Sequence, residues 1–130
     1  MARILLIDDD ADFRAMLRAK LIHFGHVVIE ARNGREGMEL FPYADAEVVI
    51  TDIVMPEKEG IEVLMELRNR QPPVKIIAIS GCGPQGAGDY LHMAQMLGAA
   101  KVLAKPFTDE ALVAAVDALV AEHPPTPDGA

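Results

Sequence analysis

The chain has 130 residues, 51% of them hydrophobic and 25% charged, and a formal net charge of −8 at pH 7. This length suits one globular domain with a sizeable core, while the acidic balance and the lack of any Lys/Arg-rich run exclude an ordinary nucleic-acid-binding surface. No apolar stretch reaches the roughly 18 residues that a membrane span requires, so neither nucleic acid nor membrane is an expected partner.

The N-terminal residues lead directly into an apolar segment and leave no room for a signal peptide. The single cysteine, Cys82, cannot form an internal disulfide, which fits a reducing compartment. We therefore expect a cytoplasmic protein.

Short apolar runs alternate along the chain with segments of helical periodicity. Their composition predicts strands over residues 4–7, 26–31, 48–51, 74–79 and 101–104. The segment after the first strand places most of its apolar residues on one helical face and ends at Gly25, a typical C-terminal helix residue. Asn33 and Glu36 have capping-box spacing for a short second helix, which we expect Pro42 to end.

Three further helices are predicted in the second half of the chain. One lies near residues 61–68, before Pro72-Pro73, and one spans 90–97 after the glycine-rich loop 81–88. The last begins at the capping residues Thr108-Asp109-Glu110 and carries a continuous apolar stripe. The proline-rich residues 123–130 are typical of a tail or linker, so we expect a folded domain over residues 1–122.

Five strand–helix units joined by right-handed crossovers predict an α/β fold, a doubly wound parallel five-stranded sheet with helices on both faces. Topology rules favour the flavodoxin-like strand order 2-1-3-4-5, which places the first and third strands side by side. In such sheets, ligands bind at the carboxyl ends of the strands. This edge would bring together the residues that end or follow four strands: Asp8, Asp9, Asp52, Ser80 and Lys105.

Each of these residues alone has a simpler explanation. The acidic run 8–10 could cap the next helix, as we expect of Asp10, while Ser80 could be a turn residue and Lys105 a surface lysine. Their convergence favours chemistry instead, because adjacent carboxylates repel one another by several kcal/mol. Mg²⁺ takes such oxygen ligands, a lysine can hold a phosphoryl oxygen, and a carboxylate can act as a nucleophile.

The residues Ile7-Asp8-Asp9, Thr51-Asp52 with Met55-Pro56 and Gly60, Ser80, and Gly98-Ala99 ahead of Lys105-Pro106-Phe107 resemble the receiver domain of two-component response regulators. The resemblance covers residues 3 to about 122. It implies phosphorylation of Asp52 by a histidine kinase or histidine phosphotransfer protein. It also implies that Mg²⁺, or Mn²⁺, binds Asp8, Asp9, Asp52 and the backbone carbonyl of Val54. Ser80 and Lys105 would contact the phosphoryl group, and the Lys105–Pro106 peptide bond would be cis.

The same resemblance implies a phosphoacceptor switch with no separate substrate turnover. A downstream protein would bind the face formed by the helix over 90–97, the strand over 101–104 and the last helix, on a monomer or weak dimer. Val102, two positions before Ala104, departs from the Tyr or Phe that the family usually carries there as its switch residue. The phosphorylation chemistry does not depend on that position, but the usual coupling to the output face does.

Three alternatives compete with this interpretation. An aspartate-nucleophile phosphatase needs a second Asp two positions after the nucleophile, where this chain has Val54. A receiver-like scaffold that ignores phosphate is the main alternative. Residues 81–86 match G-x-G-x-x-G, but no acidic residue follows about 20 positions later, which argues against dinucleotide binding.

Overall fold

The computed structural model describes residues 2–52, 59–69, 74–80, 95–96, 98–105 and 107–122 of the protein. Its strands are β1 (Arg3–Ile7), β2 (Val27–Ala31), β3 (Val48–Asp52), β4 (Lys75–Ser80) and β5 (Lys101–Ala104). Its helices are α1 (Ala11–His23), α2 (Gly34–Ala44), α3 (Glu59–Leu67) and α5 (Asp109–Glu122). Of the helix expected over 90–97, the described residues Gln95 and Met96 are helical.

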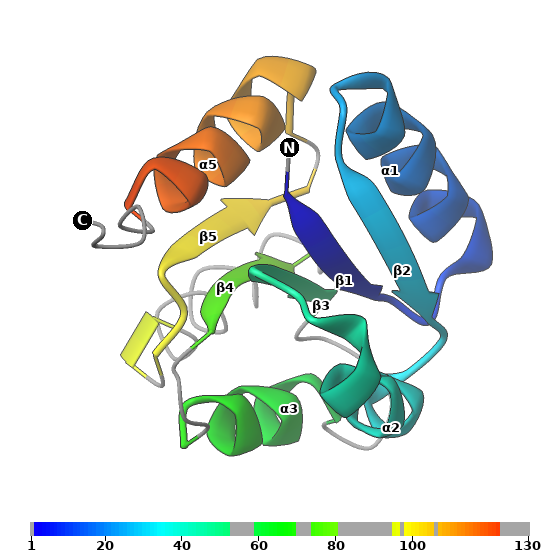
Figure 1. The fold of residues 1–130 in the computed structure, drawn as a ribbon, viewed down its shortest axis with the longest axis vertical. Coiled ribbons are helices and arrows are strands. Elements are labelled where there is room, and N and C mark those ends of the chain that lie inside the picture. Colours follow the sequence, from blue (N-terminus) through cyan, green and yellow to red (C-terminus); the bar gives the residue numbers. More distant parts are fainter. Residues whose placement is uncertain are drawn as a thin grey trace.

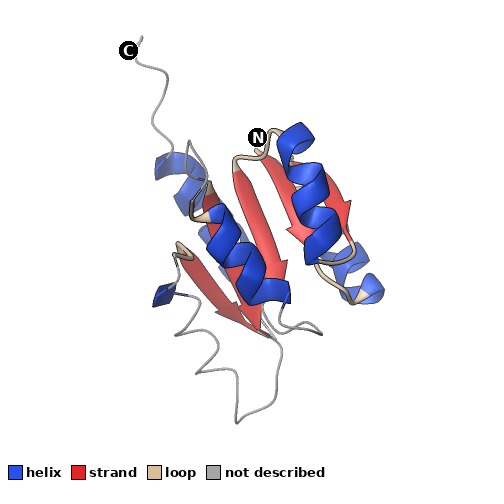
Figure 2. Ribbon diagram, turned by 90° about the horizontal axis from the view of Figure 1, so that it is seen from below, coloured by secondary structure: helices blue, strands red, loops and turns tan. Residues whose placement is uncertain are grey.

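The five strands form one parallel sheet in the order β2-β1-β3-β4-β5. In Figure 1, α1 and α5 lie on one side of this sheet, and α2 and α3 lie on the other. The view in Figure 2 shows the strand arrows pointing toward a common edge. The predicted doubly wound fold and its strand order are therefore confirmed.

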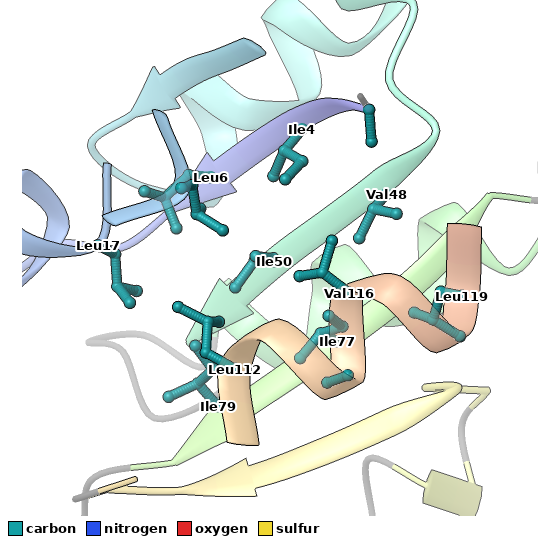
Figure 3. Close-up of a cluster of buried hydrophobic side chains, with 13 residues drawn as sticks. Ile4, Leu6, Leu17, Val48, Ile50, Ile77, Ile79, Leu112, Val116 and Leu119 are labelled. Atoms are coloured by element: carbon teal, nitrogen blue, oxygen red, sulfur yellow. The ribbon is translucent and has the colours of Figure 1, made fainter. Parts of the chain in front are cut away.

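The continuous apolar runs of the strands supply two separate hydrophobic cores. Because successive side chains of a strand point to opposite faces, Ile4 and Leu6 pack on the α1–α5 side, and Leu5 and Ile7 pack on the α2–α3 side. Figure 3 shows the first core, where residues of α1 and α5 meet those of β1, β3 and β4. Burial on both faces explains why β1, β3 and β4 lack the alternating polar positions of a half-exposed sheet.

The helix ends follow the predicted capping chemistry. Asp10 is the N-cap of α1, and its side chain accepts hydrogen bonds from the backbone N–H groups of Asp12 and Phe13, each at 3.1 Å. The Asn33 side chain accepts from the Glu36 N–H at 2.8 Å at the start of α2. Gly25, which follows the C-cap residue Phe24 of α1, has φ of 95°, a conformation that favours glycine.

The prediction that Pro42 ends the second helix is wrong, because α2 continues through Pro42 to Ala44. A proline inside a helix removes one backbone hydrogen bond, but tertiary contacts hold the last turn here. The Arg3 Nε atom donates to the Ala44 carbonyl at 3.0 Å, and Ala44 itself is buried. The helix ends at Asp45, whose φ of 51° turns the chain away.

Several predicted features lie outside the described residues. They include the Val54 carbonyl, the Met55-Pro56 turn, the glycine-rich run 81–88 with Cys82, Pro106 with its peptide bond, and the proline-rich end 123–130. Among the helices that the structure does describe, none combines the length and the apolar character needed to cross a membrane.

Candidate functional site

The strand register brings the predicted site residues to one edge of the sheet. Ile7 pairs with Thr51 between β1 and β3, so Asp8 leaves β1 beside Asp52, the last residue of β3. Asp52 pairs with Ile79 of β4, and Ser80 pairs with Ala104 of β5. The Lys105 N–H then donates to the Ser80 carbonyl at 2.8 Å. Asp52 and Ser80, which were expected just beyond their strands, are in fact the terminal strand residues.

Three carboxylates cluster at this edge. Asp8, Asp9 and Asp52 each offer an oxygen, and these oxygens all lie within 4.8 Å of one another. Asp8 and Asp52 are only 1% and 5% exposed, whereas Asp9 faces solvent. The buried pair is held by the backbone of two core strands, and the exposed member closes the cluster from the loop before α1.

Lys105 places its ammonium group among these carboxylates. Its Nζ atom lies 3.2 Å from Asp52 Oδ2 and 3.6 Å from Asp8 Oδ2. The first distance is a hydrogen bond, and the second is an ion pair without one. One ammonium among three carboxylates leaves an excess of two negative charges when all are ionised.

Asp8 is oriented by its own backbone neighbours. Its Oδ1 atom accepts from the Asp10 N–H at 2.8 Å, and its carbonyl accepts from Arg14 Nη1 at 2.7 Å. Its buried Oδ2 atom accepts no hydrogen bond from any part of the chain that the structure describes. Burial raises the pKa of Asp8 from 3.8 to about 6, against the lowering effect of the Asp10 hydrogen bond, and the charge of Asp52 raises it further.

These features fit a divalent cation. Mg²⁺ prefers carboxylate oxygens and keeps part of its water shell, so a cluster with one solvent-facing member suits it. The Asp8 Oδ2 atom is buried without a hydrogen-bond donor among the described residues, so a bound cation would satisfy it. A doubly charged ion would also match the local excess of negative charge. Asp8, Asp9 and Asp52 are therefore the residues that would hold the metal.

Two predicted residues of the site lie at its border. Ser80 is fully buried at the end of β4. Val102, the position expected to take part in switching, is partly buried in β5 and packs on the core of the α2–α3 side.

Sequence reasoning missed the contribution of two residues of the first turn of α1. Arg14 was not considered, and Phe13 was assigned only to the apolar face of its helix, yet its ring lies 3.8 Å from Lys105 Nζ. The helical spacing of Phe13 indicates that it faces inward, but the lysine comes from 92 positions later in the chain. Only the fold could show that contact.

Comparison with known proteins gives a consistent family. A model described as the response regulator receiver domain matches residues 4–117. The chemotaxis protein CheY of Thermotoga maritima is 35% identical over 116 residues, which cover 88% of this chain and 94% of that protein. The transcriptional regulatory protein GlrR of Escherichia coli is 30% identical over 129 residues, but the match spans only 28% of GlrR.

Solved structures agree with the sequence relatives. A response regulator receiver domain protein from Clostridium thermocellum superposes with a TM-score of 0.85 at 30% identity, covering 93% of this chain and 95% of that one. The chemotaxis response regulator CheY4 of Vibrio cholerae superposes with a TM-score of 0.77 at 26% identity, covering 92% and 98%. The chain thus matches some relatives over nearly their full length and others over a fraction.

Proposed function

The chain belongs to the response regulator receiver domain family of two-component signalling, and from this membership we propose that Asp52 is its phosphoacceptor. The donor would be the phosphohistidine of a histidine kinase or histidine phosphotransfer protein. The observation that carries the proposal is the meeting of Asp52 with Asp8, Asp9 and Lys105 at the carboxyl edge of the sheet.

The reaction follows from the chemistry of these groups. An Asp52 carboxylate oxygen attacks phosphorus, a new O–P bond forms, and the P–N bond to the donor histidine breaks with its electron pair returning to the imidazole. A bound Mg²⁺ would supply neutralisation of the phosphoryl oxygens. Because Asp52 is buried at the end of a rigid strand, its oxygen is held in place before the donor arrives.

Lys105 has two roles in this proposal. Before the reaction its ammonium pairs with the Asp52 carboxylate and offsets part of the negative charge of the cluster. After the reaction the same ammonium can bind a phosphoryl oxygen at nearly the same place, since the new group grows from Asp52 itself. The Ser80 hydroxyl, one strand further along the sheet, would donate to another phosphoryl oxygen.

The consequence of phosphorylation would be a signal and not a released product. We propose that a downstream protein binds the face formed by β5, α5 and the helix expected over residues 90–97, and that phosphorylation changes this face. Movement of Lys105 and Ser80 toward the phosphoryl group would reach β5 directly, because Lys105 follows β5 and its N–H bonds the Ser80 carbonyl.

Intact-mass spectrometry after incubation with acetyl phosphate and Mg²⁺ tests the phosphoacceptor. We expect the wild-type protein to gain one phosphoryl group and Asp52→Asn to gain none. Asp117→Asn, a change of an exposed aspartate on α5, is the matched control and should gain one as the wild type does. Wild-type protein that stays unmodified, or an Asp52→Asn variant that is still modified, would contradict the proposal.

A further inference from the structure

The ring of Phe13 contacts the Lys105 ammonium on a side that the carboxylates do not occupy. Lys105 Nζ lies 3.8 Å from the centroid of this ring, about as near as it lies to Asp8 Oδ2. The lysine side chain is 20% exposed, so the contact is largely screened from water. A cation over an aromatic face at such a distance is attracted by the ring quadrupole, more strongly where water is excluded.

A second aromatic residue fixes the orientation of that ring. Phe107 packs against Phe13 with centroids 6.0 Å apart and an interplanar angle of 86°. Both rings also pack on the core of the α1–α5 side. The Phe13 ring therefore has little freedom to turn its edge toward the ammonium.

The three partners of the ammonium respond differently to a divalent cation. Asp8 and Asp52 would share their charge with a metal ion, which would also repel the lysine. The ring carries no net charge and cannot ligate Mg²⁺, so its attraction for the lysine persists. We propose that Phe13 is a positioning residue, which keeps the Lys105 ammonium beside Asp52 when the metal is bound, where a phosphoryl oxygen will arrive.

This inference rests on the proposed phosphoacceptor function, but its geometric part can be tested without any phosphodonor. In NMR spectra of the Mg²⁺-loaded protein, the Lys105 Hε protons should be shifted upfield by the ring current of Phe13. The shift should vanish in Phe13→Leu and become smaller in Phe107→Leu, which removes the residue that packs against the Phe13 ring. Unshifted Lys105 Hε protons in the Mg²⁺-loaded wild type would overturn the proposal, whatever the phosphorylation assay shows.

The functional part is tested by fluorinating the ring, which weakens its negative face while changing its shape little. With mono-, di- and trifluorophenylalanine at position 13, the rate of phosphorylation by acetyl phosphate should fall stepwise, to about a fifth with three fluorines. The same residues at position 107, where the structure places no cation among its described contacts, should leave the rate within about twofold.

Two results distinguish electrostatic positioning from simple packing. A rate that stays constant across the series at position 13 would overturn the proposal, since packing depends on shape and not on the ring quadrupole. Equal losses at positions 13 and 107 would overturn it as well. If the wild type accepts no phosphoryl group at all, the proposed function fails, and the ring-current measurement still decides the placement of Lys105.

Discussion

Asp8 is the residue whose environment departs most clearly from that of an isolated carboxylate. Its pKa is raised to about 6 by burial and by the neighbouring charge of Asp52, so the folded protein favours its protonated form. Because the pKa of Asp8 is higher in the folded than in the unfolded chain, protonation of Asp8 favours the folded state. This contribution to the free energy of unfolding is complete below pH 3.8, the pKa of the unfolded chain, and is lost as the pH rises through about 6. The metal-free protein therefore carries an unfavourable charge at neutral pH.

Replacing Asp8 by Asn should reveal this cost. The amide cannot ionise but can still accept from the Asp10 N–H, so in EDTA at pH 7.5 the variant should exceed the wild type in free energy of unfolding by about 2 kcal/mol. The difference should shrink toward pH 4.5. Urea denaturation at several pH values measures it.

Mg²⁺ provides the control for that experiment. The metal should stabilise the wild type, because it binds only the folded protein, and should stabilise Asp8→Asn much less. A variant that is less stable than the wild type at pH 7.5 in EDTA would contradict the assignment of Asp8 as a strained, buried metal ligand.

Individual residues also show where prediction from sequence ends. Asp8 and Asp9 are identical and adjacent in the chain, and both were expected to be ligands. The structure separates them, because Asp8 is buried with an oriented carboxylate and Asp9 is exposed. Burial depends on what packs around the strand end, which periodicity does not report.

At the scale of elements, α2 approaches β1 unusually closely through Gly37. A Cβ atom added to Gly37 would lie 2.5 Å from Ile7 Cδ1 and 2.8 Å from Ile7 Cγ1. These distances are shorter than any normal contact, so the missing side chain is what allows α2 to pack on the strand that leads to Asp8. Glycine is therefore needed here for space.

Gly37→Ala should destabilise the protein despite the better helix propensity of alanine. The propensity gain is about 1 kcal/mol, while overpacking a well-filled core costs about 1–3 kcal/mol, so we expect a net loss of about 1 kcal/mol. Thermal or urea unfolding measures the effect.

Ile7→Val offers the matching test, because it removes the Cδ1 atom that the new methyl group would meet first. In the double variant the loss should be smaller than the sum of the two single losses. Strict additivity, or a Gly37→Ala variant more stable than the wild type, would contradict the steric explanation.

Element prediction succeeded where local chemistry decides and failed where tertiary contacts do. The caps at Asp10 and Asn33 and the positive φ of Gly25 follow from side-chain and backbone preferences within a few residues. The passage of α2 through Pro42 depends on the bond from Arg3 to Ala44, which joins residues 41 positions apart. The rule that proline ends a helix considers only neighbouring residues and takes no account of such a contact.

At the scale of the whole molecule, the strand order was predictable because few arrangements of five parallel strand–helix units satisfy the topology rules. That order alone places Asp8 beside Asp52 and Ser80 beside Lys105. The contact of Phe13 with Lys105 was not predictable, because it depends on how α1 lies across the sheet edge relative to the end of β5.

The proposed output face makes a prediction for the molecule as a whole. When Mg²⁺ and beryllofluoride are added, backbone NMR shifts should change along β5 and α5 as well as at the site, because Lys105 links the two. Asp52→Asn should show no such changes. Shift changes confined to the edge residues around Asp52 would contradict signalling through this face.

A crystal structure with Mg²⁺ and beryllofluoride tests most directly whether these separate strand ends act as one site. We predict one metal ion held by Asp8, Asp9 and Asp52, a beryllofluoride group on the Asp52 carboxylate, and Lys105 Nζ within hydrogen-bond distance of a fluorine. Beryllofluoride bound elsewhere, no metal at the three carboxylates, or Lys105 turned into solvent would contradict it.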